Sequence, residues 1–417
     1  MPAIARDLRP SLGNTAKFPS AFPSDLAPQR LSDLQFAGKL RQEQRDARYR
    51  ERRRQRLRLQ SFLWDYSSLE RLRSCGRRRI GGGSQVELRV REGVAHFAGL
   101  QTCGSIHSCP VCSAKVRQRR AEEADQAARW WLERYGQGSV LLLTLTIPHY
   151  AGDPLPELLE LVRGAFGALV SGRRWLADKA RFGLRHFIRA HDATVGPNGW
   201  HPHLHVILFG DRVLSLEELA ELEERLYSRW AGAVVARGHR APSREHGLQL
   251  EQARTRADVA SYVCQVVVGS EEERDRPIAL ELARADLKLS RHPGHRTVWQ
   301  VLDDAEQTGD CAALELWHEW ERASSGMQAI RWSQGLRLLV GLDREATNEE
   351  IAAEEIGGET LHRFDEDGNE WRAVCAARNG RQELLELAVR EGALAVRRRV
   401  AELLVQWRSR RRREEAA

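Results

Sequence analysis

The chain has 417 residues, and its 65 Lys and Arg exceed its 58 Asp and Glu, which gives a formal net charge of +7. Hydrophobic residues at 42% and charged residues at 29% are typical of a globular protein and exclude a disordered or fibrous chain. The longest apolar run, residues 140–147, is too short to span a bilayer, and the first twenty residues lack the apolar stretch of a signal peptide. We therefore expect a cytoplasmic protein of several domains without a membrane segment.

Arginine is concentrated near the two ends of the chain. Nine Arg lie in residues 41–58 and eight in residues 396–413, with five more in residues 71–79. Such segments favour a polyanionic partner, because basic side chains release counterions from a phosphate backbone. A solvated Arg-rich helical face is the alternative, and composition does not decide between the two. We expect a basic helix over residues 36–60, with Arg52, Arg53 and Arg54 as candidate DNA contacts.

The pattern of apolar residues predicts strands that alternate with helices. In chain order, we expect strands over 139–148, 184–194, 200–209 and 248–253, and helices over 155–181, 214–236 and 257–268. The residues Gly-Pro-Asn-Gly at 196–199 join two of these strands as a hairpin. Farther along, a helical segment over 311–338, a hairpin over 361–374 and a long helix over 382–407 are expected. This order predicts an α+β fold with a central antiparallel sheet and helices on one face.

Four of the seven cysteines lie close together in the sequence. Cys109 and Cys112 form a Cys-x-x-Cys pair that can turn both thiolates toward one metal, and Cys103 precedes them by six residues. Cys75 supplies the fourth ligand of a tetrahedral zinc site, with His107 as the alternative. A redox pair of Cys109 and Cys112 is the other interpretation, but it is typical of a strand-to-helix setting without a third cysteine nearby. We expect structural zinc.

Three histidines follow the predicted turn with a spacing of two. In a strand this spacing places His201, His203 and His205 on one face of the sheet. If residues 196–199 form the loop, Asp192 lies directly across from His203 on the same face. Two imidazoles and a carboxylate on adjacent strands form a divalent-metal site with open positions. A cluster of surface histidines is the alternative.

The segment 198–205, Asn-Gly-Trp-His-Pro-His-Leu-His, resembles the HUH motif (two histidines around a hydrophobic residue) of rolling-circle replication initiators. It is most similar to plasmid Rep proteins of actinobacterial type. Residues 142–146 resemble the first motif of that family, and residues 260–266 resemble the motif that carries a nucleophilic tyrosine. The cysteine segment 103–112 is similar to the one that precedes the nuclease core in this branch, and the resemblance covers residues 70–345.

The resemblance implies that Tyr262 attacks one strand of the plasmid origin, leaving a 5′-phosphotyrosine and a free 3′-OH. It also implies that His203, His205 and Asp192 bind Mg²⁺ or Mn²⁺, and that Asp258 is the base that activates water for termination. Where the family often has a Lys three residues after the tyrosine, this sequence has Gln265. We therefore expect the phosphate contact at Arg254 or Arg256, or at a site outside the motif.

The combined patterns divide the chain into four parts. These are a basic N-terminal arm (1–60), a zinc-binding module (61–130), an HUH nuclease core (131–275) and a mainly helical C-terminal region (276–417). The implied partners are origin DNA and the host helicase and replication machinery. The alternatives are an HUH transposase or relaxase, or a zinc-containing DNA-binding protein without enzymatic activity. A relaxase usually places its tyrosine before the histidines, and a two-tyrosine transposase needs a second tyrosine where this chain has Val266.

Overall fold

The structure, a computed structural model, describes residues 47–81, 84–253 and 294–415. The chain divides into two compact units, residues 1–51 and 52–417. Of the first unit only residues 47–51 are described, and they are helical. Among the described helices, none is both long and apolar enough to cross a membrane.

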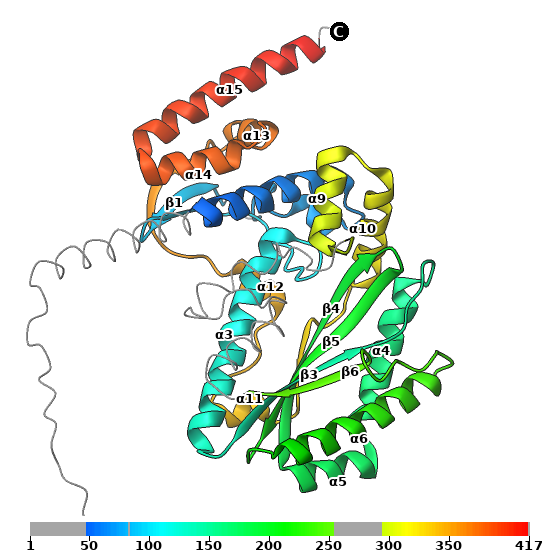
Figure 1. Cartoon of the computed structure of the whole chain (residues 1–417). Helices are drawn as coiled ribbons and strands as arrows, with labels where there is room; N and C mark the ends of the chain where they lie inside the picture. The colour runs from blue at the N-terminus through cyan, green and yellow to red at the C-terminus, as the bar shows by residue number, and fades with distance from the viewer. Residues whose placement is uncertain (1–46, 82–83, 254–293, 416–417) are drawn as a thin grey trace, which may run out of the picture. The chain divides into compact units, whose positions relative to one another are not determined.

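A sheet of six strands forms the centre of the second unit (Figure 1). Its order is β6-β3-β5-β4-β7, β8 pairs with residues 188–190 in the middle of β4, and every pair is antiparallel. This confirms the predicted α+β class with an antiparallel sheet. The strands are β3 (Ser139–Thr146), β4 (Leu184–Gly196), β5 (Gly199–Gly210), β6 (Leu248–Gln252), β7 (Arg296–Thr297) and β8 (Ile330–Trp332).

The hairpin of β4 and β5 has the register that the sequence predicts. Val195 pairs with Trp200 and Gly196 with Gly199, so the turn itself consists of two residues rather than four. Gly199 has φ +84°, and a Cβ there would lie 2.8 Å from the Tyr150 carbonyl oxygen, so this close turn requires glycine.

One face of the sheet is covered by helices that the sequence predicts. Phe166 of α4 (Leu155–Leu169) packs edge-on against Phe187 of β4, with 5.5 Å between ring centres. The predicted helix over 155–181 is two helices, because the chain breaks before Gly172, which has φ +75°, and continues as α5 (Gly172–Phe182). Next to α4 lies α6 (Leu216–Val235), which begins with a capping box formed by Ser215 and Glu218.

The opposite face is also covered, so the expectation of helices on one face is wrong. Trp131 of α3 (Pro110–Arg134) packs on Phe209 and donates its Nε1–H to the Gly210 carbonyl oxygen at 2.7 Å. Figure 1 shows α3 and α4 on opposite sides of the sheet. The reason lies in β5, where residues 206–209 are all buried and apolar; a strand that is apolar on both faces needs cover on both.

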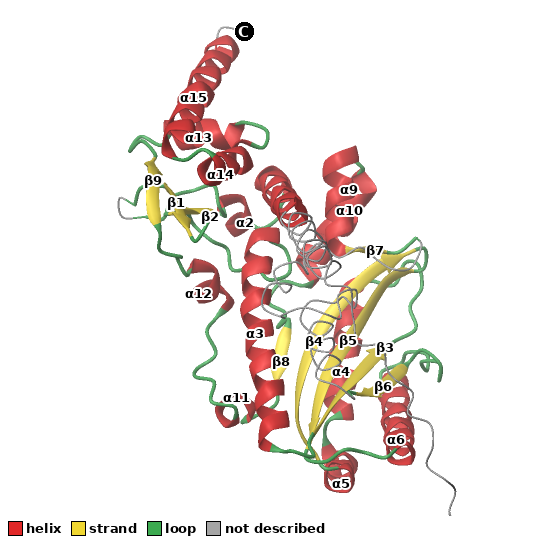
Figure 2. Cartoon of the chain, turned by 60° about the vertical axis from the view of Figure 1, so that its left-hand side comes forward, coloured by secondary structure: helices red, strands yellow, loops and turns green. Residues whose placement is uncertain are grey.

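A second hydrophobic core combines residues 86–95 with residues 364–403 near the C-terminus. The strands β1 (Glu87–Arg91) and β2 (Val94–Ala98) form a three-stranded antiparallel sheet with β9 (Glu359–Arg363). The helices α13 (Asn369–Ala376), α14 (Gly380–Arg390) and α15 (Ala393–Glu415) pack with this sheet (Figure 2). We call residues 84–100 and 359–415 together the C-terminal subdomain. Its sheet joins segments that the sequence places in different regions.

The predicted hairpin over 361–374 is wrong, because only its first arm is a strand. Asp365 accepts hydrogen bonds from the backbone N–H groups of Asn369 and Glu370, which satisfies the first turn of a helix instead. Trp371 then becomes a buried helical residue. Likewise, the predicted helix over 382–407 is broken at Gly392 (φ +77°) into α14 and α15.

The remaining helices connect these parts. The helix over residues 52–66 precedes the cysteines. The segment predicted as helical over 311–338 is a helix followed by β8 and a short second helix. The other described helices are α2 (Glu70–Ser74), α9 (Val298–Thr308), α10 (Cys311–Ala323), α11 (Leu336–Leu339) and α12 (Asn348–Ala353).

Candidate metal centres

Among the described residues, two groups of side chains have the geometry of a metal site. The first lies on the sheet, where Asp192 of β4 pairs directly with His203 of β5. His205 stands two residues farther along the same face. One possible ligand atom from each of these three side chains lies within 4.8 Å of the others. The structure therefore brings together all three residues that the sequence predicted as ligands of a catalytic ion.

Hydrogen bonds orient both imidazoles of this site. His203 Nδ1 lies 3.3 Å from the His201 carbonyl oxygen, and its Nε2 lies 3.5 Å from Asp192 Oδ2. His205 Nδ1 is 3.3 Å from the hydroxyl of Thr144, which is its partner on β3. A hydrogen bond at Nδ1 fixes the ring and directs Nε2 toward a metal. His203 is buried, whereas Asp192 and His205 are partly exposed, so a ligand can reach them.

The other histidines nearby have different surroundings. His201 Nδ1 lies 3.1 Å from His149 Nδ1, and burial lowers the pKa of His201 to about 3. His191 pairs with Leu204 and so points to the opposite face of the sheet. Burial lowers its pKa to about 3 as well. Neither ring nitrogen of His191 has a hydrogen-bond partner among the described residues. Both side chains are therefore neutral near pH 7.

The structure does not describe the segment that carries the predicted nucleophile. Tyr262, Asp258, Arg254 and Arg256 lie outside the described residues.

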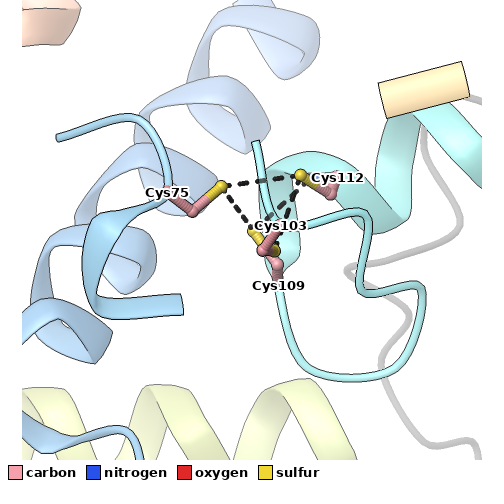
Figure 3. A group of neighbouring side chains, drawn as sticks. All are labelled: Cys75, Cys103, Cys109 and Cys112. Atoms are coloured by element: carbon pink, nitrogen blue, oxygen red, sulfur yellow. Dashed lines mark hydrogen bonds between the residues drawn. The ribbon is translucent and has the colours of Figure 1, made fainter. Parts of the chain in front are cut away.

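The second group consists of the four clustered cysteines (Figure 3). Cys75 follows α2, Cys103 lies in the loop after β2, Cys109 caps α3, and Cys112 lies in its first turn. Their sulfur atoms lie within 4.8 Å of one another, and each side chain is at most 3% exposed. His107, the alternative ligand, instead places Nε2 3.1 Å from the Met327 carbonyl oxygen. The geometry favours Cys75 as the fourth ligand.

The local backbone and the proton chemistry both suit a bound cation. The N–H groups of Ser105 and Cys112 point at the sulfurs of Cys103 and Cys109, each at 3.5 Å. Contacts with Cys103 and Cys112 hold the pKa of the Cys109 thiol well below its ordinary value, whereas contacts with Cys109 and Cys112 raise that of Cys103. The cluster thus already favours a thiolate, and a dication would favour four.

The arginines of the helix over 52–66 make contacts inside the protein. Arg53 donates to the Ala95 carbonyl oxygen, and Arg54 Nη2 lies 2.9 Å from Glu386 Oε1 of α14. Arg58 forms ion pairs with Asp303 and Glu306. These bonds tie the helix to its neighbours, so DNA contacts by Arg52, Arg53 and Arg54 stay a prediction.

Similarity to known proteins identifies the family. The chain is 31% identical to "Protein rep" from Streptomyces lividans over 354 residues. The match covers 69% of this chain and 75% of that protein. The chain belongs to the plasmid Rep protein family. It also matches "Neomycin resistance protein" from Streptomyces cyanogenus, with 32% identity over 198 residues, 37% of this chain and 45% of that protein. No family model and no solved structure matches it.

In this Rep protein, sequence reasoning missed three residues that support the two sites. Thr144 belongs to a recognised motif, but only the register shows that it contacts His205. Gln60 contacts the cysteines and Arg381 contacts Gln60, although 321 positions separate Gln60 from Arg381 in the chain. Neither carries a motif, so no sequence signal could have found them.

Proposed function

We propose that this protein initiates plasmid replication by nicking one DNA strand at the origin, with Tyr262 as the nucleophile. Membership of the plasmid Rep family supports replication initiation. The observation that carries the nicking chemistry is the convergence of Asp192, His203 and His205 on one face of the central sheet. The two histidines stand in an HUH motif, and Asp192 lies opposite the first of them.

The three side chains fit a catalytic Mg²⁺ or Mn²⁺. Two imidazoles and one carboxylate suit Mn²⁺ and leave coordination positions for phosphate oxygens. When bound, the ion supplies Lewis-acid polarisation of the scissile phosphate, which a phenol with an ordinary pKa of about 10 needs. Thr144 keeps the His205 ring in the orientation for binding.

The chain's own residues carry out the transfer. The Tyr262 oxygen attacks phosphorus, an O–P bond forms, and the bond from phosphorus to the 3′ oxygen breaks. The phenol proton leaves to solvent and the 3′ oxygen ends as a hydroxyl, which primes the polymerase. Asp258 is the base for water at termination, and Arg254 or Arg256 contacts the phosphate. A host helicase then separates the strands, and the reaction takes place in the cytoplasm.

The four cysteines hold a structural Zn²⁺ in this proposal. Four sulfur ligands complete a tetrahedral shell and leave no position for a reacting group. The cluster links Cys75, at the end of α2, to the start of α3, which leads into the central sheet. Zinc therefore supports the fold and takes no part in nicking.

A covalent-adduct assay tests the nicking proposal. The protein is incubated with Mn²⁺ and single-stranded oligonucleotides that tile both strands of its plasmid, and products are separated under denaturing conditions. We expect one oligonucleotide to give a covalent band that Tyr262→Phe abolishes. Tyr227→Phe is the matched control, because Tyr227 lies on α6 and donates to the Pro242 carbonyl oxygen.

Two results would contradict the proposal. An unchanged adduct with Tyr262→Phe excludes Tyr262 as the nucleophile. Metal-independent binding of the origin without any adduct shows a DNA-binding protein that lacks nicking activity.

A further inference from the structure

Arg381 of α14 is a buried cation without a carboxylate partner in the described parts of the chain. Its side chain packs against the helix over residues 52–66. Nη1 donates to Gln60 Oε1 at 2.5 Å, and Nη2 donates to the Leu57 carbonyl oxygen at 2.5 Å and to Ser61 Oγ at 2.7 Å. The guanidinium also lies 4.3 Å from the centre of the Trp64 ring. All these partners are neutral.

A buried charge of this kind needs an anion nearby. Burial lowers the pKa of Arg381 to about 10, so the group remains charged near neutral pH. Removing an unpaired cation from water is unfavourable, and neutral hydrogen bonds and one aromatic face offset that cost only in part. The groups near Arg381 that can become anions are the thiols of Cys375, Cys75 and Cys109, and Gln60 contacts the last two.

Gln60 joins Arg381 to the sulfur atoms. Its Nε2 lies 3.3 Å from Cys75 Sγ and 3.7 Å from Cys109 Sγ. An arginine can only donate, so the amide atom that faces Arg381 must be the oxygen. The amide NH₂ group therefore faces the cysteines, and it can only donate to them. Such a hydrogen bond is weak when the sulfur is a thiol and strong when it is a thiolate, so this contact favours thiolates at Cys75 and Cys109.

We propose that Arg381 is the countercharge of a metal tetrathiolate, acting on Cys75 and Cys109 through Gln60. This inference rests on the zinc site proposed above. One Zn²⁺ and four thiolates carry a net charge of −2, and the buried guanidinium offsets part of it. Arg381 is thus a positioning residue rather than a ligand. Because it belongs to α14, metal binding and docking of the C-terminal subdomain stabilise each other.

The proposal predicts opposite effects in the two metal states. With zinc bound, Arg381→Met removes a countercharge, so we expect zinc affinity to fall by about 10- to 100-fold. Without zinc most of the thiols are protonated and Arg381 faces little negative charge, so the same change should preserve or raise the unfolding temperature. If Arg381 acted only through its hydrogen bonds, Arg381→Met would lower the unfolding temperature in both metal states.

The experiment uses the full chain with and without zinc. Zinc content is measured by mass spectrometry of the metal, zinc release by a colorimetric chelator, and stability by thermal unfolding before and after chelation. Arg381→Met and Arg381→Lys are compared with Arg399→Met. The control removes ion pairs to Glu383 and Glu402 in the same subdomain, and it should leave zinc release unchanged. Arg381→Lys keeps the charge and should release zinc more slowly than Arg381→Met.

Gln60→Glu keeps the test decisive if Arg381→Met does not fold. A glutamate there gives Arg381 a carboxylate partner and places a negative charge against Cys75. We expect faster zinc release together with an unfolding temperature of the zinc-free protein that is unchanged or higher.

The outcomes separate this inference from the function it rests on. If the wild-type protein binds zinc, and Arg381→Met and Gln60→Glu both release it at the wild-type rate, the countercharge proposal is overturned. The zinc site itself then stands. Equal destabilisation of both metal states by Arg381→Met also overturns the countercharge proposal. Wild-type protein that binds no zinc overturns the metal site and the inference together.

Discussion

Asp192 and His203 face each other across the antiparallel strands β4 and β5, with 3.5 Å between Asp192 Oδ2 and His203 Nε2. A two-residue turn at one end of the hairpin sets this pairing. A slip of one residue would place Leu204 opposite Asp192 and turn the carboxylate away from the imidazoles. The candidate catalytic site therefore depends on the register of one hairpin.

Removal of the carboxylate tests whether these residues bind an ion. Asp192→Asn should weaken Mn²⁺ binding about tenfold or more, because an amide replaces the only charged ligand. Titration of Mn²⁺ followed by electron paramagnetic resonance measures this. Asp211→Asn is the control, since Asp211 follows the far end of β5 and accepts from Arg185. Equal Mn²⁺ affinity in Asp192→Asn and wild type would place the ion elsewhere.

The hydroxyl of Thr144 should matter for the same site. Thr144→Val keeps the shape of the side chain but removes the contact with His205 Nδ1, so the ring is less well oriented. We expect Mn²⁺ affinity to fall about tenfold with little loss of stability. Thr146→Val, on the same strand, removes a bond to the His246 carbonyl oxygen instead. If both variants bind Mn²⁺ alike, Thr144 has no special role.

Trp131 should be a main support of the second sheet face. Trp131→Phe leaves the Gly210 carbonyl oxygen without its donor and removes part of a fully buried ring. The expected loss is about 1–3 kcal/mol in the free energy of unfolding, measured with urea. Trp130→Phe, at a partly exposed neighbouring position, should cost less. A loss no larger than that of Trp130→Phe would show that α3 contributes little to the sheet.

Glu123 of α3 should make stability depend on pH. Burial raises its pKa, but hydrogen bonding and charge from Arg337 and Arg120 outweigh burial and lower the pKa below its ordinary 4.5. A group with a depressed folded pKa stabilises the protein above its unfolded pKa and loses this effect as the pH falls through the folded value.

Glu123→Gln should therefore lower the free energy of unfolding at pH 7 by about 1–3 kcal/mol and flatten its decline below about pH 4.5. Urea unfolding at several pH values checks both effects. Glu133→Gln, an exposed change on the same helix, should shift stability by less than about 0.5 kcal/mol. If the free energy of unfolding of Glu123→Gln falls with pH as in the wild type, the loss of stability in acid comes from other carboxylates.

Local patterns were sufficient to predict the candidate site. Alternation around His201, His203 and His205 and the turn residues at 196–199 define a hairpin, and a hairpin's register follows from its turn. The capping residue Ser215 and the Cys-x-x-Cys pair are likewise short-range signals. Each depends on residues that are close in the chain, so no tertiary information is needed.

Long-range packing could not be predicted in this way. Residues 206–209 are apolar on both faces of β5, but the sequence does not say that Trp131 covers one of them. The pairing of β1 with β9 joins residues more than 260 positions apart, for example Glu87 with Arg363. Such contacts follow from which surfaces remain uncovered after local folding, and no motif records them.

The sequence by itself determined the family resemblance, the two groups of candidate metal ligands and the hairpin that aligns Asp192 with His203, because these features are set by spacing and turn chemistry. Only the tertiary structure decided that helices cover both faces of the sheet and that a distant helix places Arg381 beside Gln60. Whether a buried charge stabilises or destabilises a protein depends on the groups around it, and those groups come together only when the chain folds.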